Sequence, residues 1–169
     1  MLIDIGVNLS NSRFSGDIEN VLLRAEQSNV KKIVLTGTSV TETEACIELC
    51  EKYKGQFPGM LYATAGIHPH EASSFNNSAI NAIAHLAQHP SIVAIGETGL
   101  DFNRNLSPEK MQESAFEAQI ELAENSQLPL FLHERDASKR QLEILTSYQN
   151  SLPKAVIHCF TGDKRTLFS

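Results

Sequence analysis

The feature that most restricts the fold of this chain is a regular alternation of short apolar runs with helical patterns. The apolar runs are rich in Ile, Val and Leu, as strands buried on both faces are. They recur about every thirty residues, at Leu2–Val7, Ile33–Leu35, Leu61–Ala65, Ile92–Ile95, Pro129–Leu132 and Ala155–Ile157. Alternation at this spacing predicts βαβ units and a parallel sheet.

Amphipathic helical stripes fill the intervals between the predicted strands. They cover residues 18–25, 45–53, 79–86, 111–122 and 142–148. The sequence Thr41-Glu42-Thr43-Glu44 predicts a capping box before the second helix, and Ser107-Pro108-Glu109 predicts the start of the fourth. No linker rich in Pro, Gly or Ser divides the pattern, so we expect a single domain over residues 1–169.

Two α/β architectures have this alternation, an open doubly wound sheet and a (β/α)8 TIM barrel. Polar residues at the ends of successive strands favour the barrel, where enzymes build their sites. A doubly wound fold would more often have a Gly-rich phosphate loop after the first strand, and Gly6-Val7-Asn8-Leu9 is not one. A barrel needs eight strands and about 250 residues. We therefore expect an incomplete barrel of about six βα units, truncated before strands seven and eight.

Composition excludes several classes of protein. The net charge of −6 argues against a broad basic face that coats nucleic acid, although it does not exclude a nuclease. No apolar run is long enough to span a bilayer, and the N-terminus lacks a signal-peptide pattern, so we expect a cytoplasmic protein. The three cysteines form no disulfide framework, and Cys46 and Cys50 are predicted to be core residues.

Ionisable residues follow three successive predicted strands. Glu97 comes after the fourth, between Gly96 and Gly99, while His133 and His158 follow the fifth and the sixth. A carboxylate at the end of a buried strand is costly unless a cation or a donor compensates it. Two imidazoles and a carboxylate suit zinc or manganese and leave a position open for water. The sequence therefore predicts a divalent-metal site at one rim of the sheet.

Other polar residues are candidates for contact with a substrate. Asn8, at the end of the first strand, could offer an amide oxygen to a metal or orient a water, or only begin a loop. His68 is a better candidate than His70 to touch a phosphate or act as an acid, and His70 is interpreted as a loop residue. Arg135 or Arg104 could clamp a phosphate through two hydrogen bonds, or form a salt bridge with a neighbouring carboxylate.

Five segments together resemble the TatD family of metal-dependent deoxyribonucleases: Ile3–Leu9, Ala65–His70, Ile95–Phe102, His133–Ala137 and His158–Gly162. The resemblance covers the whole chain. It implies a barrel of the metallo-dependent hydrolase type and a cytoplasmic, Mg²⁺-dependent nuclease, with Mn²⁺ and Zn²⁺ as alternative metals. The implied activity is 3′-to-5′ exonucleolytic on single-stranded DNA and also RNA, with a role in DNA repair.

The resemblance also assigns roles to residues. Glu97 matches the bridging carboxylate, and His133 and His158 match the two histidine ligands. His68 would take part in catalysis and, with Arg135, position the phosphate. Two departures are evident. Gly6-Val7-Asn8 replaces the His-x-His common in the family, and a metal-binding aspartate after a seventh strand has no counterpart among these residues, which predicts weak activity or none.

Two other functions fit the sequence. The same barrel could carry a metal-dependent hydrolase of small amides or esters. Alternatively, the chain is an inactive fragment that associates with another chain, because the first and sixth strands of an open sheet leave unpaired edges.

Overall fold

The computed structural model describes residues 1–164 and 168, and it contains a sheet of six strands. The strands lie in sequence order and each neighbouring pair is parallel. They are β1 (Leu2–Val7), β2 (Val30–Leu35), β3 (Leu61–Ala65), β4 (Ile92–Asp101), β5 (Leu130–Arg135) and β6 (Ala155–Ile157). The βα alternation predicted from the apolar runs is therefore confirmed.

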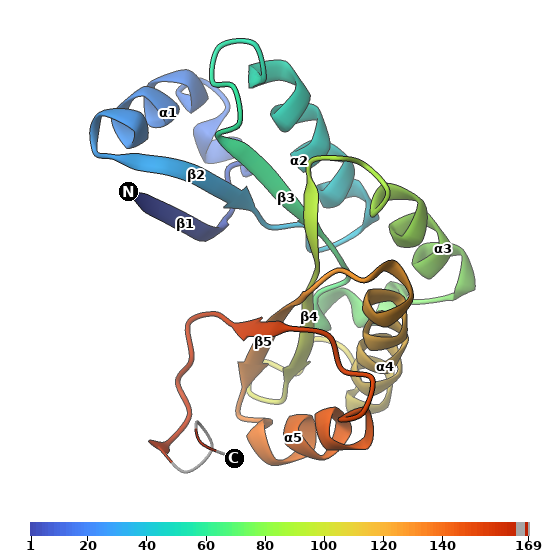
Figure 1. Cartoon of the computed structure of the whole chain (residues 1–169). Helices are drawn as coiled ribbons and strands as arrows, with labels where there is room; N and C mark the ends of the chain where they lie inside the picture. The colour runs from blue at the N-terminus through green and yellow to red at the C-terminus, as the bar shows by residue number, and fades with distance from the viewer. Residues whose placement is uncertain (165–167, 169) are drawn as a thin grey trace.

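Five α-helices connect the strands and lie along the outer side of the curled sheet (Figure 1). They are α1 (Ile18–Gln27), α2 (Val40–Tyr53), α3 (Asn77–Leu86), α4 (Glu109–Ser126) and α5 (Ser138–Ser147), and two short 3₁₀ helices, η1 (Ser12–Phe14) and η2 (Pro69–Ser74), follow β1 and β3. Figure 1 shows the inner side of the sheet open between β1 and the C-terminal end. The arrangement is that of an incomplete (β/α)8 barrel, as predicted.

The start of α2 differs from the capping box expected at Thr41–Glu44. The helix begins at Val40, and the side-chain oxygen of Ser39 accepts a hydrogen bond from the amide of Glu42 at 3.2 Å. Ser39 has an extended backbone, as N-cap residues do. The predicted cap was wrong by two positions because Thr41 and Glu44 already lie within the first helical turns.

Strand β4 is longer than predicted, and this changes the position of Glu97. The apolar run ends at Ile95, but the strand continues to Asp101, so Glu97 lies within the strand and not after it. The pairing of β4 with β5 shifts between Gly96 and Thr98, which leaves Glu97 as the extra residue of a β-bulge. Bulges re-aim a side chain, and this one lies at the candidate site.

Two glycines allow β4 to lie against β5 around the bulge. Gly96 has φ of +142°, and a Cβ there would lie 2.2 Å from the carbonyl oxygen of Phe131. Gly99 has φ of +138°, and a Cβ there would lie 2.0 Å from the carbonyl oxygen of His133. Neither position can hold a side chain without moving β5.

Two buried glutamines join the outer helix α4 to the backbone at the strand ends. Gln112 on α4 accepts from the amide of Asp101 at 2.8 Å and donates to its carbonyl at 3.2 Å. Gln119 on α4 makes the same pair of bonds to Ile67, next to His68, at 2.7 and 3.0 Å. These side-chain amides supply hydrogen bonds to backbone N–H and C=O groups that have no partner in the sheet, and they fix the ends of the strands.

The core lies between the sheet and the helices, and both predicted core cysteines belong to it. Cys46 and Cys50, on α2, are buried. Burial raises the pKa of the Cys46 thiol to about 12 and that of the Cys50 thiol to about 11. Both thiols are therefore protonated at neutral pH and pack as small apolar groups, as predicted.

The two outermost strands expose apolar side chains. On β1, Leu2 is 59% and Ile3 is 53% exposed, and on β6 Val156 is 42% exposed. Strands β1 and β6 each pair with only one neighbour among the strands that the structure describes. These edges resemble the unpaired surfaces expected from the sequence.

Candidate metal centre

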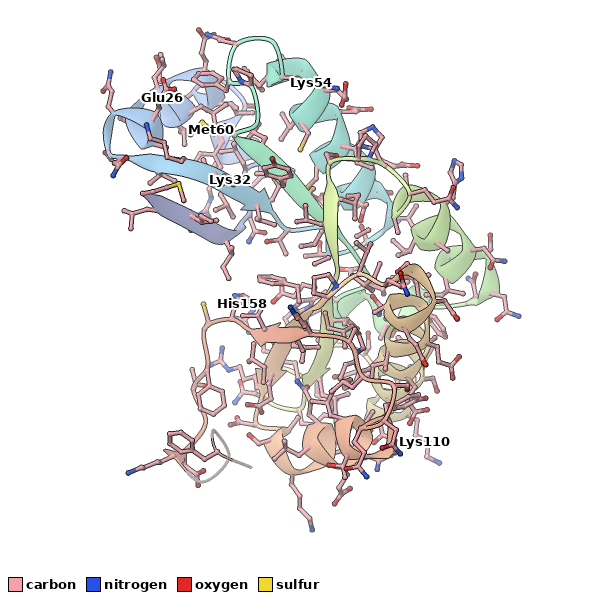
Figure 2. The ribbon with its side chains drawn as sticks, viewed as in Figure 1. Glu26, Lys32, Lys54, Met60, Lys110 and His158 are labelled. Atoms are coloured by element: carbon pink, nitrogen blue, oxygen red, sulfur yellow. The ribbon has the colours of Figure 1, made fainter. Side chains whose placement is uncertain are left out.

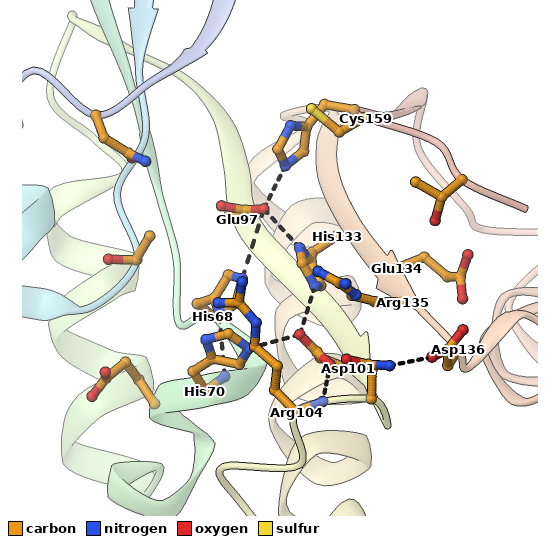
Figure 3. Close-up of a pocket in the computed structure, with 16 residues that line it drawn as sticks. His68, His70, Glu97, Asp101, Arg104, His133, Glu134, Arg135, Asp136 and Cys159 are labelled. Atoms are coloured by element: carbon orange, nitrogen blue, oxygen red, sulfur yellow. Dashed lines mark hydrogen bonds and ion pairs between the residues drawn. The ribbon is translucent and has the colours of Figure 1, made fainter.

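A cleft of about 690 Å³ opens at the carboxyl ends of the strands, and Glu97 lies at its centre (Figure 3). Only 6% of Glu97 is exposed. Three imidazoles from three different segments surround one of its carboxylate oxygens. This arrangement brings together the three residues on which the predicted metal site depended.

The oxygen Oε1 of Glu97 is the point on which these imidazoles converge. It accepts a hydrogen bond from Nδ1 of His133 at 3.0 Å and another from Nε2 of His158. Nε2 of His68 lies 3.7 Å from the same oxygen. Burial raises the pKa of Glu97, but the bonds from His133 and His158 more than offset it and hold the pKa well below its usual range. The carboxylate is therefore charged.

His158 follows β6, and its ring is held by an aromatic neighbour. It stacks on Phe131 of β5 with ring centroids 4.7 Å apart and planes 16° from parallel. Figure 2 shows His158 on the inner side of the molecule, at the end of β6. Stacking restricts rotation of the ring and keeps Nε2 directed at Glu97.

His133, near the end of β5, lies between two carboxylates. Nδ1 bonds Glu97, while Nε2 lies 3.3 Å from Oδ2 of Asp101. Burial lowers the pKa of His133, but the hydrogen bonds to Glu97 and Asp101 outweigh it and raise the pKa above its usual value. Without a metal, this imidazole is stabilised in its charged form.

His68 behaves differently because its environment favours the neutral ring. Burial lowers its pKa to about 3, against the opposing charge of Glu97. Its Nδ1 accepts a hydrogen bond from the backbone amide of His70 at 3.1 Å, so the single proton of the neutral ring is on Nε2. His68 therefore directs an N–H group into the cleft. It is suited to donate to an oxygen and not to release a proton as an acid.

This assignment predicts a pH dependence in the metal-free protein. Unfolded His68 takes up a proton near pH 6.5, whereas the folded protein resists it down to about pH 3. Between pH 6.5 and 4.5 the unfolded state therefore binds more protons, and the free energy of unfolding decreases as the pH falls, by up to about 1.4 kcal/mol per pH unit. His133, whose pKa is raised from 6.5 on folding, opposes this slope near pH 6.5, and Glu97, whose pKa is lowered from 4.5, adds to it near pH 4.5. In the middle of the window the slope therefore reports His68.

Chemical denaturation at a series of pH values measures this slope. His68→Gln should reduce the slope between pH 6.5 and 4.5. His85→Gln, on the exposed surface of α3, is the matched control and should retain it. An unchanged slope in His68→Gln would contradict a buried neutral His68.

The donor set fits a divalent metal ion. Ligand atoms of His68, Glu97 and His133 lie within 4.8 Å of one another, close enough for one ion to contact all three. The lone pair of His68, however, is used by the amide of His70. Glu97, Nδ1 of His133 and Nε2 of His158 are therefore the better ligand set. Two imidazoles suit Zn²⁺ and related ions more than Mg²⁺, which prefers oxygen.

The residues predicted to contact substrate lie on the walls of the same cleft. Asn8, just after β1, and Arg135, at the end of β5, both line it, as does Arg104. Arg135 is exposed, and its guanidinium makes no ion pair within residues 1–164. The alternative of a salt bridge is therefore not realised for Arg135 in the described part of the chain.

Two residues of the site were missed by sequence reasoning. His70 was interpreted as a loop residue, but it lies in η2, and its Nε2 is 2.7 Å from Oδ2 of Asp101. Asp101 was not selected from the sequence; it is the last residue of β4 and is 1% exposed. If the fourth strand is extended past Gly96 and Gly99, residues 97, 99 and 101 fall at alternate positions. Alternate residues of a strand share one face, so this extension could have identified Asp101 as a neighbour of Glu97.

Comparison with known proteins identifies the family. The family model described as TatD related DNase matches residues 3–169. The chain belongs to the TatD-related DNase family. A relative from Pectobacterium carotovorum named "3'-5' ssDNA/RNA exonuclease TatD" is 46% identical over 166 residues, and one of the same name from Dickeya dadantii is 48% identical over 162 residues. These matches cover 98% and 95% of this chain.

This TatD-family chain spans about 60% of the length of these relatives, 62% of the first and 60% of the second. Solved structures agree with the fold. A TatD family hydrolase from Entamoeba histolytica superposes with a TM-score of 0.91 at 27% identity, covering 99% of this chain and 60% of that one. A TatD homologue from Escherichia coli gives 0.86 at 29% identity, covering 98% and 62%.

Proposed function

We propose that this chain carries the metal-binding part of a nuclease that hydrolyses phosphodiester bonds. The observation that carries the proposal is the convergence of His133 and His158 on one oxygen of the buried Glu97, in an open cleft. Family membership supports it, because relatives are named exonucleases. When bound there, a divalent metal would polarise a phosphodiester oxygen and lower the pKa of a bound water.

The side chains around this centre have complementary tasks. Glu97, His133 and His158 would hold the metal. His68 would donate a hydrogen bond from its Nε2–H group to a phosphate oxygen, since its Nδ1 is fixed as an acceptor. Arg135 and Asn8 would contact the phosphate and sugar from the walls of the cleft. A guanidinium binds a phosphate through two parallel hydrogen bonds, so Arg135 would also set its orientation.

The proposed substrate is single-stranded DNA, degraded from its 3′ end, with RNA also accepted. The names of the relatives support both substrates and this polarity. We propose Mg²⁺ as the working metal because the family resemblance implies it, and Zn²⁺ and Mn²⁺ as alternatives because the two imidazoles suit them better than Mg²⁺. The biological setting we propose is DNA repair in the cytoplasm. No helix in the described residues is long and apolar enough to cross a membrane.

A nuclease assay tests the proposal. The purified chain is incubated with single-stranded DNA labelled at either end and with Mg²⁺, Mn²⁺, Zn²⁺ or a chelator. We expect weak, stepwise shortening from the 3′ end that requires a metal and is abolished by the chelator. Small amide and ester substrates are tested in parallel. Hydrolysis of these and not of DNA would favour the second enzyme function and contradict this one.

Arg135 provides a prediction about substrate binding. Arg135→Lys retains the charge but loses the bidentate contact, so KM for single-stranded DNA should rise about tenfold with a smaller change in kcat. The control is Lys110→Ala, an exposed cation on α4 that lies far from His158 in Figure 2. Steady-state kinetics measures both. A KM that Arg135→Lys leaves unchanged would exclude a role in phosphate binding.

We also propose that the chain self-associates through the edges of β1 and β6. These strands expose backbone groups on one side and apolar side chains such as Leu2 and Val156. Unpaired edges of this kind pair readily with a second chain. Sedimentation velocity should show oligomers whose fraction rises with concentration. A cooperative, folded monomer at all concentrations would contradict the proposal.

A further inference from the structure

Asp101 is a buried carboxylate that the proposed chemistry does not use. Its Oδ2 lies 2.7 Å from Nε2 of His70 and 3.3 Å from Nε2 of His133, and its Oδ1 accepts from the backbone amide of Arg104 at 2.8 Å. Gln112 holds the peptide groups on both sides of Asp101. The carboxylate is thus fixed by its backbone as well as by its oxygens.

The contacts of His133 are divided between its two nitrogens. Nδ1 is directed at Glu97, where the metal would bind, and Nε2 is directed at Asp101 (Figure 3). A neutral imidazole carries one proton, and it ligates a metal only through the nitrogen that lacks it. An ionised carboxylate can only accept hydrogen bonds. Asp101 therefore favours a proton on Nε2.

We propose that Asp101 is a positioning residue that retains the proton of His133 on Nε2 and so leaves Nδ1 free to bind the metal. The inference rests on the proposed metal centre. His70 helps to hold the Asp101 carboxylate in place, because its Nε2 donates to Oδ2 of Asp101. The ring of His70 in turn packs against the ring of His68, with centroids 4.3 Å apart. The result is a continuous chain from His70 through Asp101 to His133 and Glu97.

The substitution Asp101→Asn separates the positioning role from side-chain size. An amide has one acceptor oxygen and one donor nitrogen. If its oxygen faces the amide of Arg104, its NH₂ group faces both imidazoles and requires their Nε2 atoms to accept. In the opposite orientation, the NH₂ group meets the N–H of Arg104. Either orientation opposes the arrangement that the carboxylate supports.

The matched control is Asp136→Asn, the same substitution in the same cleft. Asp136 is exposed, and its carboxylate accepts from the side chain of Asn103 at 2.6 Å and contacts no imidazole. Its φ of +54° is one that asparagine tolerates. This variant should therefore behave as the wild type in every measurement below.

Zn²⁺ is the probe because it is diamagnetic and suits imidazole. Calorimetric titration measures its affinity, and nitrogen-15 NMR of the histidine rings identifies which nitrogen of His133 binds it and which is protonated. We expect Nδ1 coordination and a slowly exchanging Nε2 proton in the wild type. In Asp101→Asn, we expect Zn²⁺ affinity to fall by roughly 10- to 100-fold and the Nε2 proton to exchange rapidly.

Coordination through Nε2 in the wild type, or equal affinities in the wild type and Asp101→Asn, would overturn the proposal. The wild-type spectrum shows which nitrogen of His133 binds Zn²⁺ even if Asp101→Asn does not fold. The spectrum of the metal-free wild type tests the contact between Asp101 and His133 independently of the proposed function. If the wild type binds no Zn²⁺, the metal centre fails. A protected Nε2 proton in the metal-free wild type would still support the contact with Asp101, and its absence would exclude it.

Discussion

Replacing Glu97 by glutamine should abolish metal binding and reduce nuclease activity by at least about 100-fold, since even residues that only support metal ligands contribute 10- to 100-fold. Glu97 is the point on which His133, His158 and His68 converge, and it is 6% exposed. Glu97→Gln retains the shape of the side chain but removes the charge that offsets a cation. Metal content by elemental analysis and the rate on labelled single-stranded DNA measure the two effects.

Glu134→Gln is the control for this substitution. Glu134 is the next residue after His133, is 8% exposed and also lines the cleft. Its Oε1 accepts a hydrogen bond from the amide of Ala137, a bond that a glutamine oxygen can also make. Metal content and rate should therefore stay near wild-type values. Equal metal content in the wild type and Glu97→Gln would remove the proposed centre, whatever the effect on rate.

Gly99→Ala should destabilise the fold by roughly 3 kcal/mol or more. Two causes act together. The residue has φ of +138°, which side chains rarely adopt, and a Cβ would lie 2.0 Å from the carbonyl oxygen of His133. Relief of this contact requires β5 to move away from β4, and β5 carries His133. Metal affinity should decrease together with stability. Denaturation with urea measures the free energy of unfolding.

Gly55→Ala tests whether the effect is specific to the position. Gly55 follows α2, and a Cβ there would have no heavy atom within 4 Å. The same added methyl group should change the free energy of unfolding by less than about 0.5 kcal/mol. A similar loss in both variants would indicate a general cost of removing glycine. A stable Gly99→Ala protein would show that β4 and β5 can separate without consequence.

The part of the site predicted correctly from sequence consists of residue types at the ends of apolar runs. Glu97, His133 and His158 were selected because charged or imidazole groups there need a partner, and the structure brings them within contact distance. Their roles as ligands remain predictions. Asp101 was missed because the expected strand was ended at Ile95, whereas β4 continues through two glycines to Asp101. His70 was missed with it, because the partner of His70 is Asp101. Glycine usually weakens a strand, so local propensity argued against this continuation.

The sequence by itself determined that the chain forms parallel βα units and that Glu97, His133 and His158 lie near one rim of the sheet. These properties depend on periodicity and on the chemistry of single residues, which are local. Only the tertiary structure decided the bulge at Glu97, the nitrogen that each histidine directs at it, and the contact of His133 with Asp101. These depend on strand register and on contacts between residues more than thirty positions apart. No local pattern encodes such contacts, because the orientation of a ring is decided by the neighbours that folding brings to it.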